Sequence, residues 1–118
     1  MNVQGLTWLG TRAGQFEAMV GFAEDVLGLT RSFEREGLVG FQLPDGSLFE
    51  VFAPGVPGGG HPREGVVGGF KVDDLAAVVD ELHAAGVEVG ELQTAGGSAA
   101  WVYFRAPDGN LYELIGPA

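Results

Sequence analysis

The spacing of hydrophobic and polar residues changes along the chain between a helical period and a strand period. Two segments carry apolar residues at helical spacing: one is Gln15–Leu27, and the other ends at Ala85 after an N-cap at Asp73 or Asp74. A glycine follows each of them, as is common at helix ends. The other apolar stretches are short and typical of strands. They are Val3–Arg12, Thr30–Arg35, Leu38–Leu43, Leu48–Ala53, Val66–Val72, Val87–Leu92, Ala100–Arg105 and Leu111–Ile115. Each half of the chain is therefore predicted to read strand, helix and three strands.

One segment occurs twice. Phe41–Pro54 aligns without a gap to Phe104–Pro117 at an offset of 63 residues, and seven of the 14 positions are identical. Both copies contain Pro-Asp-Gly, a typical hairpin turn, and then a strand that holds one carboxylate, Glu50 or Glu113. Such self-similarity is the signature of a repeated supersecondary unit.

The repeat predicts one domain, residues 1–118, made of two units at about 3–54 and 65–117 with a Gly/Pro-rich linker at 55–64. A single unit of this kind cannot bury both faces of its own sheet. We therefore predict an α+β fold in which two tandem βαβββ modules form a curved mixed sheet, with a concave cup between them and the helices outside.

Composition narrows the possible partners. The formal net charge is −10 and only six residues are Lys or Arg, which argues against nucleic acid and against an anionic membrane. The same charge favours cationic ligands, or it serves only for solubility. The chain has no cysteine, which excludes disulfides and thiolate metal sites. No apolar run is long enough to span a membrane and the start lacks a signal-peptide pattern, so we expect a cytoplasmic protein.

Three motifs resemble the vicinal oxygen chelate superfamily, which includes glyoxalases, bleomycin resistance proteins and extradiol dioxygenases. They are F-A-E-D-V-L-G-L at Phe22–Leu29, F-K-V-D-D-L at Phe70–Leu75 and A-P-D-G-N-L-Y-E-L at Ala106–Leu114. The resemblance covers nearly the whole chain and implies the two-module fold. It does not fix the activity, because the superfamily hosts many chemistries.

The resemblance also implies where a metal site would lie. Metal-dependent members bind one divalent ion through two early strand positions and two late glutamates. The late positions match Glu50 and Glu113, but the early positions fall on Trp8 and Val67, which cannot ligate a metal. The two histidines, one in the linker and one on the second helix, are expected to be solvated. The resemblance therefore implies no metal cofactor here, and a divalent metal remains the alternative.

The two glutamates are the first candidates for chemistry. Each lies in an otherwise apolar strand, and burial there would raise its pKa. A carboxylate with a raised pKa could serve as a general base or as an anchor for a ligand amine. The alternative is that Glu50 and Glu113 are inherited scaffold, hydrogen-bonded without a role. Trp8 offers a flat surface for stacking a planar ligand, or fills the core.

We expect a ligand-binding surface that adds to the two glutamates the following residues: Trp8, Phe52, Val67, Trp101, Tyr103 and Arg105. For Arg105, a surface position or an ion pair with a glutamate is the alternative.

These patterns favour a small-molecule-binding protein of the sequestration or antibiotic-resistance type, which works without a metal and takes a cationic or planar aromatic compound. The rival is a glyoxalase- or dioxygenase-type enzyme, a lyase, isomerase or oxygenase that uses Glu50 or Glu113 with a divalent metal. A third possibility is an interaction module that uses the fold to dimerise. A homodimer is expected.

Overall fold

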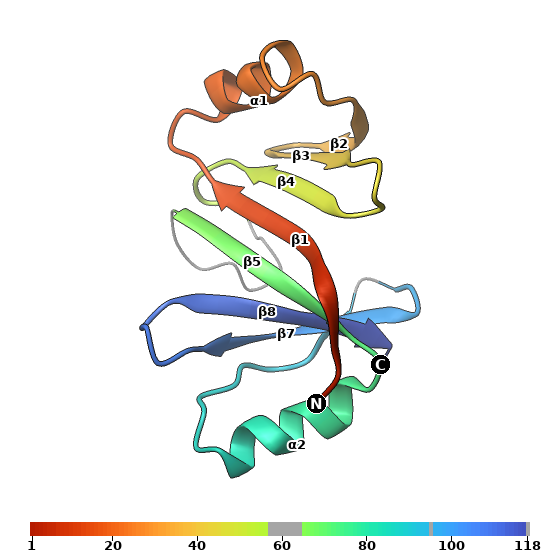
Figure 1. Cartoon of the computed structure of the whole chain (residues 1–118). Helices are drawn as coiled ribbons and strands as arrows, with labels where there is room; N and C mark the ends of the chain where they lie inside the picture. The colour runs from red at the N-terminus through yellow and green to blue at the C-terminus, as the bar shows by residue number, and fades with distance from the viewer. Residues whose placement is uncertain (57–64, 95, 118) are drawn as a thin grey trace. The chain divides into compact units, whose positions relative to one another are not determined.

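The computed structural model describes residues 1–56, 65–94 and 96–117, so His61 and most of the predicted linker lie outside the described residues (Figure 1). The elements follow one another as β1 (Val3–Arg12), α1 (Phe16–Asp25), β2 (Arg31–Arg35), β3 (Leu38–Gln42), β4 (Leu48–Phe52), β5 (Gly65–Val72), α2 (Leu75–Ala84), β6 (Gln93–Thr94), β7 (Ala99–Arg105) and β8 (Leu111–Pro117). Strand, helix and three strands thus occur twice, which confirms the predicted α+β fold of two tandem βαβββ modules.

The strands of the two modules have the same order. In the first module the order is β2-β3-β4-β1, and in the second it is β6-β7-β8-β5. Antiparallel pairs join the three later strands of each module, and the first strand lies parallel to the last. A shared concave cup between the modules stays a prediction of the sequence.

The chain forms two compact units whose limits divide β1. Trp8–Val66 is the first unit, and Met1–Thr7 joins Val67–Ala118 in the second. Two contacts hold the start of the chain in the second unit. The amino group of Met1 lies 3.1 Å from a carboxylate oxygen of Glu81, and Asn2 donates to Asp73 at 3.4 Å.

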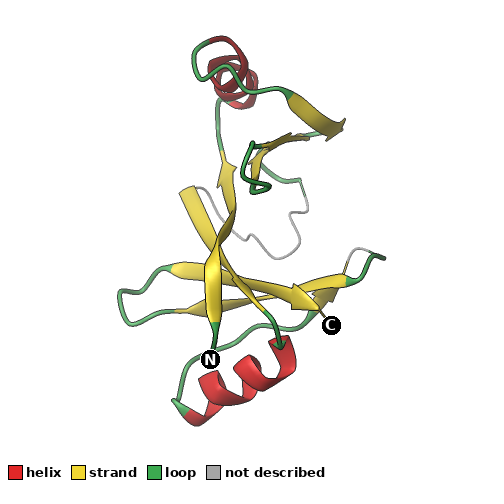
Figure 2. Cartoon of the chain, turned by 45° about the vertical axis from the view of Figure 1, so that its right-hand side comes forward, coloured by secondary structure: helices red, strands yellow, loops and turns green. Residues whose placement is uncertain are grey.

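Each helix covers one face of its own module's sheet, where the core lies (Figure 2). Between α1 and its sheet the buried side chains are Val20, Ala23, Val39, Phe41, Phe49 and Val51. Between α2 and its sheet they are Val72, Leu75, Val78, Ala100, Val102 and Leu114. Because side chains alternate along a strand, the residues between these core positions lie on the face away from the helix. We call that face of each sheet its far face.

The local signals for the second helix are confirmed. The carboxylate of Asp74 accepts from the backbone N–H of Ala77 at 3.1 Å and caps the helix. At the other end Gly86 has a φ of +76°, and the next residue, Val87, donates to the carbonyl of Leu82 at 2.9 Å. This is the hydrogen bond of a Schellman motif, which glycine permits because it lacks a Cβ.

The repeated turn has the same geometry in both modules. In each copy the aspartate carboxylate accepts from the backbone N–H two residues later at 2.9 Å, from Ser47 to Asp45 and from Asn110 to Asp108. The pKa of each aspartate is lowered, first by its bonded side chain, Ser47 or Tyr112, and also by the backbone bond. The predicted hairpins are thus confirmed.

One predicted strand is largely absent, and several other predicted elements end one or two residues from their predicted limits. The segment Val87–Leu92 was expected as a strand, but it makes one isolated bridge, Val89 to Phe104, and the strand β6 comes after it at Gln93–Thr94. Gly90 lies in the middle of the segment and weakens a strand, since it has no side chain to pack. The first helix ends at Asp25, two residues before its predicted end.

No helix among the described residues is long and apolar enough to cross a membrane. His83 lies exposed on α2, as its position on the polar flank of that helix predicts.

The core beneath α1 gives a direct test of this packing. Phe41 is fully buried, whereas Phe22 on α1 is 46% exposed. We expect Phe41→Ala to lower the free energy of unfolding by about 3–5 kcal/mol through lost contacts and a cavity. Phe22→Ala, with the same change of side chain, should lower it by only about 0.5 kcal/mol. Urea unfolding measures both values, and equal losses would contradict the placement of the helix.

Candidate functional site

Glu50 belongs to a row of four residues that crosses the far face of the first module. The strand registers place Gly40 of β3 and Gly10 of β1 directly beside Glu50, and Phe33 of β2 beside Gly40. The row therefore reads Phe33, Gly40, Glu50 and Gly10. The carboxylate rises from the sheet between two residues without side chains, so that space remains on both sides of it.

Trp8 fills the space on one side. It precedes Gly10 by two residues and so shares its face, and a Cβ atom at Gly10 would lie 2.3 Å from two ring atoms of Trp8. Glycine is therefore required for the indole to lie along the strand. In that position the indole Nε1–H donates to Oε1 of Glu50 at 2.6 Å. A hydrogen bond from this N–H favours the ionised form of the carboxylate.

Phe33 covers the glycine on the other side. A Cβ atom at Gly40 would lie 2.1 Å from Cε1 of Phe33 and 2.5 Å from its Cζ. Phe33 remains 38% exposed, whereas Trp8 is only 8% exposed. Glu50 is thus flanked by two aromatic rings, each lying over a glycine of a neighbouring strand.

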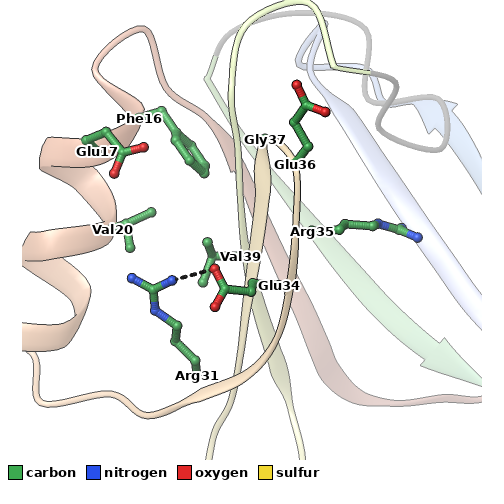
Figure 3. Close-up of a pocket in the computed structure, with 9 residues that line it drawn as sticks. All are labelled: Phe16, Glu17, Val20, Arg31, Glu34, Arg35, Glu36, Gly37 and Val39. Carbon is green, nitrogen blue, oxygen red and sulfur yellow. Dashed lines mark hydrogen bonds and ion pairs between the residues drawn. The ribbon is translucent and has the colours of Figure 1, made fainter.

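Two opposing effects set the charge of Glu50. Burial raises its pKa above the ordinary value, and this is the largest effect; the hydrogen bond from Trp8 and the positive charge of Arg35 act in the opposite direction. Arg35 reaches this face because it alternates with Glu34, and Figure 3 shows it pointing away from α1 while Glu34 points toward Arg31. A half-buried carboxylate of this kind can accept a proton or hold a cation.

Phe52 lies on the same face, two residues after Glu50, but its ring is already engaged. The guanidinium of Arg12 lies 5.4 Å from the centre of the Phe52 ring, and Phe52 is 4% exposed. Arg12 also donates to the carbonyls of Ala53 and Val56 at 2.8 and 2.7 Å. These contacts tie the end of β4 to β1.

The second module has a related arrangement, with Val67 at the position of Trp8 and a tyrosine at the position of Gly40. Glu113 of β8 pairs with Gly69 of β5 on one side and with Tyr103 of β7 on the other. Tyr103 therefore takes the place that Gly40 has in the first module. Glu113 and Tyr103 are 4% and 7% exposed, so this carboxylate is buried where Glu50 is half-buried.

The other predicted residues of the second module share its far face. Trp101 and Arg105 alternate with the core positions of β7, and Val67 precedes Gly69 by two residues. Val67 is buried and Trp101 is half-buried. Arg105 lies at the strand end, where it donates to the carbonyl of Gly109 at 2.8 Å and pairs with Glu88 at 3.4 Å.

The residues at the expected metal positions do not fit a divalent ion. The indole nitrogen of Trp8 is only a hydrogen-bond donor and cannot ligate a metal, and its N–H is hydrogen-bonded to Oε1 of Glu50. Val67 is aliphatic and 5% exposed. In residues 1–56, 65–94 and 96–117, no three His, Cys, Asp or Glu side chains gather as a metal would need.

A cavity of about 380 Å³ lies elsewhere, between α1 and the β2–β3 hairpin (Figure 3). Phe16, Val20 and Val39 form its apolar part, and Glu17 and Glu34 lie at its edge. Glu50 and Trp8 do not line it. The cavity is on the helix side of the sheet and is separate from the row around Glu50.

Three residues of the row, Phe33, Gly40 and Gly10, were not among the site residues predicted from the sequence. The available signal was the two glycines, because a glycine inside a strand marks a place where another group approaches the backbone closely. Which aromatic ring approaches each glycine depends on the pairing of β2 with β3 and on the direction of Trp8 along β1.

Solved structures of low sequence identity share the fold. Methylmalonyl-CoA epimerase from Mycobacterium tuberculosis is 18% identical, with 98% of this chain and 89% of that chain covered and a TM-score of 0.71. The Mn(II)-bound glyoxalase from Novosphingobium aromaticivorans is 20% identical, with coverages of 97% and 39% and a TM-score of 0.77. A superfamily member from Vibrio splendidus 12B01 is 21% identical, with coverages of 97% and 100% and a TM-score of 0.68. No curated protein sequence matches the chain.

A family model identifies the chain more directly. The model described as Glyoxalase/Bleomycin resistance protein/Dioxygenase superfamily matches residues 5–114, nearly the whole chain. The match agrees with the repeated βαβββ modules and with the resemblance seen in the sequence motifs. The chain belongs to the Glyoxalase/Bleomycin resistance protein/Dioxygenase superfamily.

Proposed function

We propose that the chain is a small-molecule-binding protein of the sequestration type, which holds a cationic, aromatic ligand at Glu50 without a metal. The observation that carries this proposal is the hydrogen bond of 2.6 Å from Trp8 to Glu50. In the metal-binding pattern these two positions would both supply ligands to an ion. Here one side chain donates a hydrogen bond to the other instead, and a carboxylate with aromatic neighbours remains.

Charge and polarity support the class of ligand. A carboxylate beside aromatic rings attracts a cation through its charge and through the electron-rich ring faces. The net charge of −10 raises the local concentration of cations around the whole protein. A bound cation would lower the pKa of Glu50 and so counteract the effect of burial, because a positive charge favours the ionised carboxylate.

A homodimer and a cytosolic location are part of the proposal. Leu6 of β1 and Val66 of β5 are 69% and 64% exposed, and apolar side chains of this kind favour burial against a second copy.

An enzyme is the second candidate, and the raised pKa of Glu50 favours it. A carboxylate whose pKa lies closer to neutrality is a better general base. Several structures with the same fold are named methylmalonyl-CoA epimerases. In such a reading Glu50 would remove a proton from carbon, and Trp8 would hold the carboxylate in position.

Binding by Glu50 is tested with N-methylquinolinium, a flat aromatic cation. We expect saturable binding in calorimetry and about tenfold weaker binding by Glu50→Gln, because the amide keeps the shape and loses the charge. The matched control is Glu36→Gln, which makes the same change of charge on the exposed β2–β3 turn. Equal weakening by both variants would mean that only the net charge attracts the cation.

The pH dependence of binding gives a second test. The ionised form of Glu50 binds the cation, so affinity should rise as the pH rises through its raised pKa and level off above it. Trp8→Phe removes the N–H that favours the ionised form, so the rise should move to higher pH. Calorimetric titrations at a series of pH values measure the shift. An unchanged midpoint in Trp8→Phe would contradict the role given to this hydrogen bond.

The enzyme reading is tested by proton exchange. The protein is incubated with methylmalonyl-CoA in heavy water. We expect the acidic C–H proton of the thioester to exchange with deuterium no faster than it does in buffer without protein. Proton NMR follows the loss of that signal. Exchange that the wild type accelerates and Glu50→Gln does not would overturn the binding proposal in favour of general-base catalysis.

A further inference from the structure

We propose that Phe33 is the surface on which the ligand stacks, that Trp8 positions Glu50 without stacking on the ligand, and that the site takes a flat aromatic monocation laid across Glu50 and Phe33. This inference rests on the proposed function and adds to it a binding residue and a division of roles. It arises from the row Phe33, Gly40, Glu50 and Gly10 across the first module's sheet.

The two rings beside Glu50 differ in exposure. Phe33 is 38% exposed and Trp8 is 8% exposed, so a ligand can lie against much more of the phenyl ring than of the indole. The polar edge of Trp8 is also already directed at Glu50, to which it donates. Trp8 therefore fixes the orientation of the carboxylate, and Phe33 offers a free ring face.

Gly40 leaves the space in which the Phe33 ring, the proposed stacking surface, lies. The Phe33 ring lies where a Cβ atom of any other residue at position 40 would be, at 2.1 Å from Cε1. The ring consequently lies low over β3 beside Glu50. Gly40 thus sets the specificity of the site through Phe33.

The dimensions of a sheet fit a fused two-ring ligand. Neighbouring strands are about 4.8 Å apart, so Gly40 and Gly10 are separated by about 10 Å with Glu50 midway between them. A ligand that stacks on the ring over Gly40 brings a positive charge at its other end to Glu50. The carboxylate can accept this contact because the indole uses only one of its lone-pair directions.

Arg35 limits the charge of the ligand. It follows Phe33 by two residues on the same strand, shares its face and acts on Glu50 through its charge. One carboxylate next to a fixed cation favours a ligand with a single positive charge. A ligand with two charges would be repelled by Arg35 once Glu50 is neutralised.

The test measures binding of N-methylquinolinium by calorimetry to the full chain, with circular dichroism to verify folding. We expect Phe33→Ala to weaken binding about tenfold, and Phe33→Trp to retain it because a larger ring face remains. The matched control is Phe22→Ala, since Phe22 is 46% exposed on α1 in the same unit. It should change the affinity less than about twofold.

Gly40→Ala tests whether binding depends on the position of the Phe33 ring, without removing the ring itself. The added methyl group should displace Phe33 and weaken N-methylquinolinium binding as strongly as Phe33→Ala does. Gly68→Ala is the control, because a Cβ atom there meets nothing within 4 Å. Quinaldine has nearly the same shape and is neutral in mildly alkaline buffer, so it should bind the wild type at least about tenfold more weakly than the cation.

The outcomes separate this inference from the proposed function. If Glu50→Gln weakens binding while Phe33→Ala and Gly40→Ala bind as the wild type does, the role of Phe33 is wrong and the binding function stands. If neither Glu50→Gln nor Phe33→Ala changes the affinity, both are wrong. Absence of saturable binding by the wild type, or equal affinity for quinaldine, would overturn the aromatic monocation as the ligand class.

Discussion

The strand register within each sheet is the constraint on which the rest of the molecule depends. One face of each sheet is buried beneath a helix, so every second residue of a strand must be apolar and face the core. A shift of one residue would turn Val51 outward and Glu50 into the core beneath α1, at the cost of burying a carboxylate among apolar side chains. The packing of α1 therefore places Glu50 on the far face, even though the helix does not touch it.

The hydrogen bond between Trp8 and Glu50 depends on this strand register. It joins β1 to β4 through side chains in the same place where the superfamily pattern would put metal ligands. The indole keeps the carboxylate ordered and favours its ionised form against the effect of burial. The carboxylate is thus hydrogen-bonded next to aromatic rings, which suits the recognition of a cationic ligand that we propose.

The two modules differ in the residue that lies beside the glutamate on the antiparallel neighbouring strand, and this difference accompanies the different burial of the two carboxylates. Gly40 and Tyr103 are equivalent by the offset of 63 residues, and each lies beside the glutamate of its module. Where the glycine stands, Phe33 lies over the backbone and Glu50 remains half-buried. Where the tyrosine stands, Glu113 is 4% exposed. The same scaffold thus presents one carboxylate and buries the other.

Most of the elements, the repeat and the superfamily could be predicted from patterns in the sequence. Periodicity, the cap at Asp74 and the turns at Asp45 and Asp108 are local properties, because neighbouring residues supply the hydrogen bonds that define them. The two glutamates could also be selected from the sequence, since each is a charged residue in an apolar strand. The strand expected at Val87–Leu92 was wrong, because the segment makes a single bridge, from Val89 to Phe104, and regular pairing with β7 begins only at Gln93.

Only the tertiary structure decided which side chains surround Glu50. Trp8 and Phe33 lie 42 and 17 residues away in sequence, and no local pattern states that both rings lie over glycines beside the same carboxylate. That arrangement follows from the register of four paired strands and from the absence of a Cβ atom at Gly10 and Gly40. Contacts between strands are set by the packing of the whole sheet, whereas the sequence records only which residues are able to make them.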